Sequence, residues 1–346
     1  MPLISPFAGL RPLPEKAEDV VAPPYDVLNT SEARERAKDK PWSFLHISKP
    51  EIDLPEGTDP YDAAVYQKGA ENLQKMIKEG LLKRDDQPCY YFYQLQMGDH
   101  VQTGLVAAAS VEAYEHNRIK KHEFTRPVKE DDRVRQIDAL NAQTGPVFLA
   151  YRGCDQVNAI VDEVTAGEPE MNVIADDGVR HTLWVVSDHD KITTLTAAFS
   201  NIGTVDTLYV ADGHHRSAAG TRVAGMRKAA NPHHKGNESY NYFLSVMFPA
   251  EQLEILDYNR VVKDLNGHNP AELLMLLEKN FTVKPASGQY KPSQPGEFGM
   301  YLDGKWYQLN INPELIPNDP VKRLDVSLLA DNLIEPFLGI SDPRTD

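Results

Sequence analysis

Cysteine is scarce in this chain of 346 residues, which contains only Cys89 and Cys154. The two lie far apart in the sequence, and neither belongs to a Cys-x-x-Cys pair. The spacing therefore predicts neither a disulfide framework nor a cysteine-ligated zinc site.

Long apolar runs and an excess of positive charge are also lacking. No segment approaches the roughly 20 apolar residues that cross a bilayer, and residues 1–7 lack the basic and apolar segments of a signal peptide. The formal net charge of −15 argues against nucleic acid or an anionic membrane surface as a partner. We therefore expect a cytoplasmic protein that binds small molecules, and the pattern indicates no particular oligomeric state.

The glycine-rich fingerprints of the common nucleotide-binding folds are absent as well. The sequence holds neither G-x-G-x-x-G nor G-x-x-x-x-G-K-[ST]. Any nucleotide site in this chain is therefore of another kind.

Hydrophobic residues make up 41% of the chain and charged residues 25%, which is typical of a globular protein with a core. Asp-Gly turns between runs of strand formers predict hairpins over 172–186 and 298–309. Apolar residues at helical spacing predict helices over 60–77 and 326–337. Short apolar runs predict strands, among them 44–47 and 253–256.

Strands and helices alternate irregularly along the chain, without the regular rhythm of a doubly wound parallel sheet. We therefore expect a mixed α/β fold of the α+β type. The domain that carries the site is expected over 1–230. A C-terminal α+β part over 231–346 is expected to complete the fold.

The turn over 211–217 is the strongest functional signal in the sequence. It follows the apolar run 208–210, which predicts a buried strand, and it leads into a helical pattern. Gly213 permits a tight turn, and the first turn of the helix presents free N–H groups and the positive end of its dipole. With His214, His215 and the donors of Arg216 beside it, this turn predicts an anion site, most naturally for phosphate. The structural alternative is a corner in which Asp212 caps the helix.

Two other segments carry candidate site residues. The segment 118–133 is dense in charges of both signs and sets carboxylates beside strong cations, a common way to adjust pKa values at a site. A solvated charged helix is the alternative explanation. The segment Pro23-Pro24-Tyr25-Asp26 forms either the wall of a site or a rigid surface turn. His233 and His234 lie in a polar stretch that favours a mobile loop over a metal site.

Five stretches of this chain resemble the DUF1015 family, and together they cover nearly all of it. These are residues 4–12, 22–27, 121–127 with 130–133, 210–216, and 324–327 with 338–340. The turn over 212–216 is similar to that of the free serine kinases built on the ParB/sulfiredoxin-like fold. The resemblance implies a nucleotide-binding core of that type, elaborated with additional hairpins and helices.

The resemblance also implies an activity, since those enzymes phosphorylate free L-serine with a nucleotide and magnesium. ATP or ADP and Mg²⁺ are then the expected cofactors, with Mg²⁺ bound through Asp212. Glu123 takes the place of the catalytic base, although the hairpin over 172–186 separates it from the turn. The implied assignments are catalytic roles for His122, Glu123 and Asp212, nucleotide or phosphate binding by Gly213, His214, His215, Arg216 and Ser217, and substrate binding by Asp26, Arg126 and Arg133.

Two other functions remain open at this point. The chain could be a non-catalytic nucleotide-binding regulatory protein, because turns of this kind also bind nucleotide in relatives that are not kinases. A third interpretation is a hydrolase in which His214 or His215 activates water. No metal-ligand spacing in the sequence supports that third interpretation.

Overall fold

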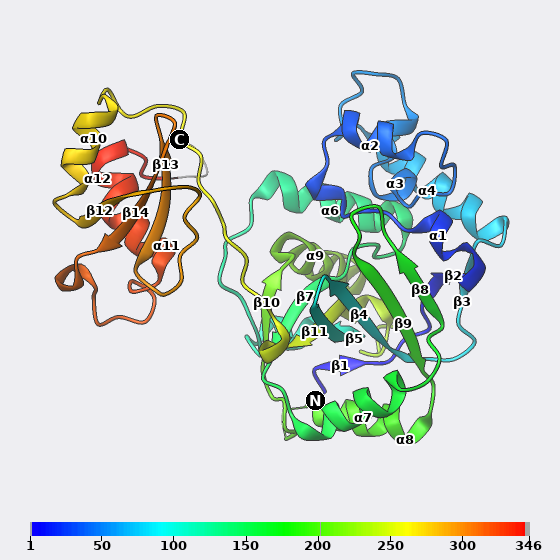
Figure 1. Ribbon diagram of the computed structural model, residues 1–346. Coiled ribbons are helices and arrows are strands. Elements are labelled where there is room, and N and C mark those ends of the chain that lie inside the picture. Colours follow the sequence, from blue (N-terminus) through cyan, green and yellow to red (C-terminus); the bar gives the residue numbers. More distant parts are fainter. Residues whose placement is uncertain (1, 201, 343–346) are drawn as a thin grey trace. The chain divides into compact units, whose positions relative to one another are not determined.

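The computed structural model describes residues 2–200 and 202–342, and the chain divides into two compact units, Met1–Ile255 and Leu256–Asp346 (Figure 1). The division falls later than the boundary at 230 expected from the sequence. The reason is strand β11 (Tyr242–Pro249), which lies between two other strands of the first unit's sheet. The C-terminal residues form a unit with a core of its own, so the expectation that they complete the first domain is corrected.

A nine-stranded mixed sheet is the centre of the first unit. Its strands follow the order β6-β10-β7-β11-β5-β4-β9-β8, and β1 pairs with β5. Within this sheet, β6 runs parallel to β10 and β7 parallel to β11, whereas the other pairs are antiparallel. Besides β11, the strands are β1 (Ile4–Ser5), β4 (Tyr90–Met97), β5 (His100–Ser110), β6 (Ile119–Lys120), β7 (Val147–Tyr151), β8 (Met171–Ile174), β9 (Arg180–Val186) and β10 (Leu208–Asp212).

Helices cover both faces of this sheet (Figure 1). Helices α7 (Asp155–Thr165) and α8 (His189–Ala198) pack on one side, where Val157 and Leu195 join the strand residues in the main core. On the other side α9 (His214–Ala230) packs against α6 (Pro127–Leu140) through an apolar contact of Val134 with Val223. The hairpin over 172–186 confirms the sequence prediction, and Asp188 caps α8.

A helical layer and a small second sheet complete the first unit. The helices are α1 (Ala17–Val20), α2 (Thr30–Ala37), α3 (Leu45–Ser48), α4 (Ala63–Lys78) and α5 (Val111–Glu115), and the sheet pairs β2 (Leu10–Pro12) with β3 (Leu82–Arg84). The strand expected over 44–47 is wrong, because this segment forms α3. Leu45 and Ile47 are buried there, and so short an apolar run fits either periodicity.

The second unit holds a three-stranded antiparallel sheet of order β12-β14-β13. Its elements are α10 (Pro270–Leu277), β12 (Phe281–Ala286), β13 (Glu297–Leu302), β14 (Lys305–Ile311), α11 (Asp325–Leu329), a π-helical turn (Ala330–Ile334) and α12 (Glu335–Leu338). The predicted Asp-Gly hairpin is confirmed, with positive φ at Asp303 and Gly304. The strand expected over 253–256 is wrong, because these residues pair with no strand and Ile255 is 97% exposed.

Within the described residues, no helix is both long enough and apolar enough to span a bilayer. This finding agrees with the lack of long apolar runs in the sequence.

The pair formed by His46 and Asp53 makes the stability of the first unit dependent on pH. His46 Nδ1 lies 2.8 Å from Asp53 Oδ1, and this hydrogen bond raises the pKa of His46 above its usual value. A raised folded-state pKa contributes stability that is complete below about pH 6.5 and is lost as the pH rises through the folded value. We expect His46→Gln to lower the free energy of unfolding by about 1–2 kcal/mol at pH 6 and by less at pH 8.5, as measured by urea denaturation.

The matched control is His233→Gln, which removes an exposed histidine. It is expected to leave the free energy of unfolding unchanged at both pH values. An equal loss of stability at pH 6 and pH 8.5 in His46→Gln would contradict the role of the ion pair.

Candidate functional site

Parallel pairing of β6 with β10 brings two distant parts of the sequence together. Leu208 pairs with Ile119 and Tyr209 with Lys120. Because parallel strands end at the same edge of a sheet, the residues after Lys120 emerge beside the residues after Tyr209. The register therefore sets His122 and Glu123 next to the end of β10 and the turn into α9.

The turn itself has the geometry that the sequence predicted. Gly213 has φ +94° and stands at the N-cap of α9, with no side chain capping the helix. The suggested capping role of Asp212 is therefore wrong. Its carboxylate Oδ2 instead accepts a hydrogen bond from Arg216 Nη2 at 2.5 Å. The first amides of α9 consequently remain without a side-chain cap, at the positive end of the helix dipole.

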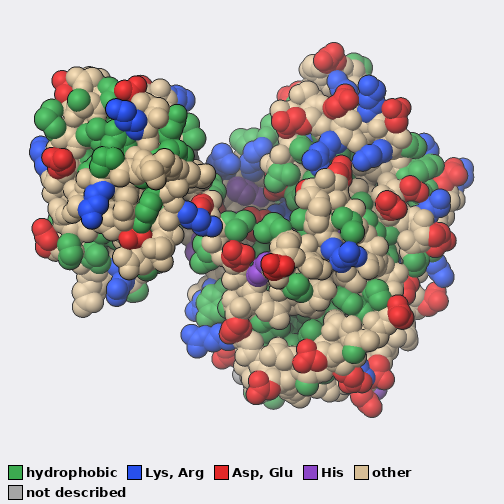
Figure 2. Space-filling view, in the orientation of Figure 1, with side chains coloured by type: hydrophobic (Ala, Val, Ile, Leu, Met, Phe, Trp, Pro, Cys, Tyr) green, Lys and Arg blue, Asp and Glu red, His purple; other side chains and the backbone are tan. Residues whose placement is uncertain are grey.

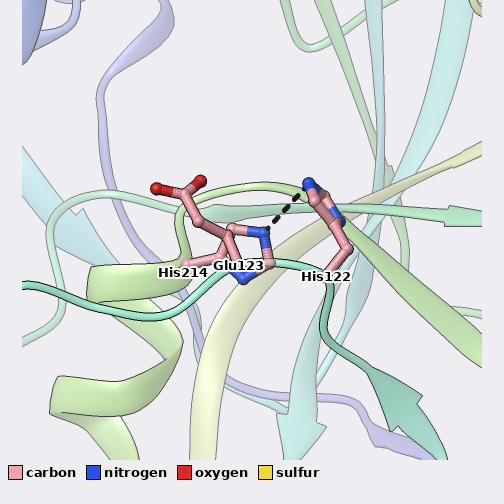
Figure 3. A group of neighbouring side chains, drawn as sticks. All are labelled: His122, Glu123 and His214. Carbon is pink, nitrogen blue, oxygen red and sulfur yellow. Dashed lines mark hydrogen bonds between the residues drawn. The ribbon is translucent and has the colours of Figure 1, made fainter. Parts of the chain in front are cut away.

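Two histidines and a glutamate meet at this turn (Figure 3). His214 Nε2 lies 3.3 Å from His122 Nε2, and one ligand atom from each of His122, Glu123 and His214 lies within 4.8 Å of the others. His214 is only 5% exposed, and its Nδ1 has no hydrogen-bond partner among the described residues. Burial, together with the neighbouring His122, lowers the pKa of His214 and so favours its neutral form.

His215 has a positioning contact with α6. The backbone N–H of Arg126 donates a hydrogen bond of 3.0 Å to His215 Nε2, which must therefore be unprotonated. Burial lowers the pKa of His215, in agreement with this acceptor role. Arg126 is the N-cap of α6 and Pro127 occupies its first position, so the histidine contacts the very start of that helix.

A second group of predicted residues surrounds Tyr25. The Arg133 guanidinium lies 4.1 Å from the centre of the Tyr25 ring, and Arg216 Nη2 lies 3.8 Å from Asp26 Oδ2. Arg216 Nη1 also donates to the carbonyl of Pro146. Tyr25, Arg133 and Arg216 belong to a narrow cleft whose lining also includes Ser48, Gln143 and Thr144. The buried hydroxyl of Ser48 has no hydrogen-bond partner there.

The predicted site residues therefore fall into two neighbouring groups. His122, Glu123, His214 and His215 gather at the start of α9, whereas Arg133 lines the cleft and Asp26 lies 3.8 Å from Arg216. Arg216 touches both, because it binds Asp212 and lines the cleft. Figure 2 shows histidine side chains in a hollow of the larger unit, bordered by lysine or arginine side chains.

One expectation needs adjustment. Ser217 is 0% exposed and its hydroxyl donates to the carbonyl of His214, so its side chain is not placed to bind phosphate. The backbone N–H of Arg126 bonds His215. Asp212 is paired with Arg216 and is not a member of the histidine-glutamate group.

Sequence reasoning missed two features of the site. Ser48 lies in a short apolar segment that carries no motif, so nothing in the sequence marked it as a lining residue. The contact between His122 and His214, which are 92 positions apart, depends on the pairing of distant strands. Recognition of the short apolar segment at Ile119 as a strand parallel to 208–210 could have revealed this contact.

The fold and site define a mixed α/β protein with an uncapped helix terminus, a histidine-glutamate group and a charged cleft at one sheet edge. The family described as "Protein of unknown function (DUF1015)" matches residues 4–327, and the chain belongs to this family. No curated protein and no solved structure matches the chain.

The backbone at Gly213 provides a test of how the turn is built. A Cβ at this position would lie 3.2 Å from Arg216 Nε and 3.4 Å from Val147 Cα, in addition to the cost of φ +94°. We expect Gly213→Ala to lower the free energy of unfolding by more than the roughly 1–2 kcal/mol that a left-handed residue costs, as measured by urea denaturation.

Gly178 is the matched control, because its φ is +82° and a Cβ there would touch nothing within 4 Å. Gly178→Ala is expected to lower the free energy of unfolding only by the cost of the left-handed backbone. Equal losses in the two variants would show that contact with Arg216 does not constrain Gly213.

Proposed function

We propose that this protein is a small-molecule kinase that transfers phosphate from ATP or ADP to a free hydroxy amino acid, with L-serine as the expected acceptor. The observation that carries the proposal is the β6–β10 register, which sets Glu123 beside the uncapped start of α9. The resemblance of the turn over 212–216 to that of the free serine kinases suggests a ParB/sulfiredoxin-like nucleotide-binding core. Such a reaction would take place in the cytoplasm, where nucleotides and free amino acids are available.

The start of α9 is suited to the phosphates of the nucleotide. Its first amides lack a side-chain cap, and its first turn contains no acidic residue that would repel an anion. Without a Cβ, Gly213 allows phosphate oxygens to approach the backbone. Asp212, which is 68% exposed, offers the oxygen ligand that a nucleotide-bound Mg²⁺ prefers. Arg216 stays in place through Asp212 and the Pro146 carbonyl.

The cleft beside Tyr25 is suited to a small zwitterion. Arg133 bonds Asp132, and Arg216 bonds Asp212 and the Pro146 carbonyl, so the two guanidiniums offer a carboxylate their charge and the donors outside these bonds. Asp26, within 3.8 Å of Arg216, supplies a negative charge for an ammonium group. The unpartnered hydroxyl of Ser48 adds a hydrogen-bonding group that has no structural task.

Glu123 is the residue proposed to accept the proton of the attacking hydroxyl. Its carboxylate is exposed, and it lies near two imidazoles, His122 and His214. Phosphoryl transfer depends on positioning and charge more than on covalent chemistry by the protein. A base within reach of the hydroxyl, a phosphate cradle and a cation are therefore sufficient parts.

The first test is an assay by phosphorus NMR with Mg²⁺, ATP or ADP, and a panel of free hydroxy amino acids. We expect a phosphoserine signal from the wild type. Glu123→Gln should reduce turnover by about 100-fold or more, because general-base catalysis contributes about 10²–10⁴-fold. Its affinity for the nucleotide should change little, since the amides of α9 hold the phosphates.

Glu168→Gln is the matched control, because it removes an exposed carboxylate in the loop before β8. It should retain full turnover. Equal losses of turnover and nucleotide affinity in Glu123→Gln would contradict its role as the base. Nucleotide binding without any phosphorylated product would favour the regulatory alternative.

Ser48→Ala tests the place of the acceptor. Because its hydroxyl has no partner in the structure, its removal should leave the free energy of unfolding unchanged within about 0.5 kcal/mol. If the hydroxyl bonds the acceptor, KM for serine should rise about 3- to 10-fold, as expected for one hydrogen bond. An unchanged KM would place the acceptor outside the cleft.

A further inference from the structure

The side chains of His122, Glu123 and His214 form a set of donors that the proposed phosphate transfer does not fully use. They come from the loop after β6 and from the first turn of α9 (Figure 3). One donor atom of each lies within 4.8 Å of the others. Two imidazoles and a carboxylate that converge in this way resemble the protein half of a metal centre.

The contact between the two imidazoles is a poor hydrogen bond. The Nε2 atoms are 3.3 Å apart, at the long end for a hydrogen bond. The ring centres are only 4.4 Å apart and the rings are perpendicular, at 89°. The two rings therefore meet edge to face. In contrast, a separation of about 3.3 Å is what two nitrogens have when they bind one tetrahedral metal at about 2.0–2.1 Å.

His214 is buried, yet one of its two ring nitrogens lacks a partner among the described residues. It is 95% buried, since 5% of it is exposed, and its Nδ1 has no hydrogen-bond partner among the described residues. No group among the described residues accepts from or donates to Nδ1, so Nδ1 can carry the ring proton while Nε2, which faces His122, presents its lone pair to an ion.

We propose that His122, Glu123 and His214 bind a divalent transition-metal ion at the start of α9, with Zn²⁺ as the best match to the donors. Imidazole nitrogen suits Zn²⁺ and its neighbours in the first transition row, whereas Mg²⁺ prefers oxygen ligands alone. Three protein ligands leave a coordination position open for water or for a substrate oxygen, as in catalytic sites. This ion is distinct from the Mg²⁺ that accompanies a nucleotide.

The metal site does not depend on the proposed kinase activity. A carboxylate that binds a metal through one oxygen keeps its second oxygen as a proton acceptor. Glu123 can therefore serve in both roles. Asp212 is not needed as a ligand, because its carboxylate is paired with Arg216.

The test is Zn²⁺ binding to the full chain after treatment with a chelator, measured by competition with a chromophoric chelator. Co²⁺ in place of Zn²⁺ gives a visible absorption spectrum that reports the coordination geometry. We expect one equivalent to bind. His122→Ala should weaken binding by at least about 100-fold, because loss of an outer-shell partner alone costs 10–100-fold. Glu123→Gln should also weaken it.

His122 is the decisive position, because it is exposed and its removal leaves no cavity, whereas His214→Ala removes a buried side chain. His233→Ala, in the exposed loop after α9, is the control and should bind Zn²⁺ as the wild type does. Absence of stoichiometric binding, or binding that His122→Ala leaves unchanged, would overturn the proposal.

The outcome is separable from that of the kinase test. The binding measurement contains no nucleotide and no amino acid. Zn²⁺ binding without phosphoserine would support the metal site and overturn the kinase activity. Phosphoserine formation without Zn²⁺ binding would support the kinase activity and overturn the metal site.

Discussion

The parallel pairing of β6 with β10 is the interaction on which the site depends. β6 contains only two residues, and its place is held by burial of Ile119 beside Leu208, both of which are 0% exposed. The carbonyl of Arg118 adds a hydrogen bond from Leu208 N. A shift of the β6–β10 register by one residue would move each side chain of β6 to the opposite face of the sheet. The contact of His122 with His214 therefore depends on the burial of Ile119 and Leu208, which lie outside the site.

Charge at this edge is balanced by contacts between near neighbours. Arg216 binds Asp212 and lies close to Asp26, so one guanidinium partly neutralises carboxylates from two segments. Burial keeps His214 and His215 toward their neutral forms, which leaves the start of α9 as a source of positive potential. An anionic ligand would therefore meet fixed dipoles and an anchored guanidinium, and no side chain would first have to be displaced from the helix terminus.

Local chemistry made much of this fold predictable from the sequence. The Asp-Gly turns, the cap at Asp188 and Gly213 all act through residues adjacent in the chain, and the structure contains each element. What could not be predicted depends on distant partners. Segment 44–47 is helical because of its surroundings, and β11 extends the first unit because it inserts between β7 and β5. The contact of His122 with His214 likewise depends on partners that are distant in the sequence.

The stretches that resemble the DUF1015 family divide into two kinds when placed on the structure. In the first stretch, Gly9 N bonds the hydroxyl of Tyr91, and Arg11 pairs with Asp85, so these residues hold the fold. In the last, Asp325 accepts a hydrogen bond from Gly296 N within the second unit. These contacts explain the residue types without any ligand.

The other three stretches, 22–27, 121–133 and 210–216, supply the cleft, the histidine-glutamate group and the helix turn. Each contains a polar group whose placement the fold alone does not explain. His214 is buried with an unpartnered nitrogen, and Glu123 is exposed beside two imidazoles. Asp26 faces a guanidinium that Asp212 already neutralises. Folding gains little from these arrangements, and for this reason the two proposals place binding and chemistry at this edge of the first unit's sheet.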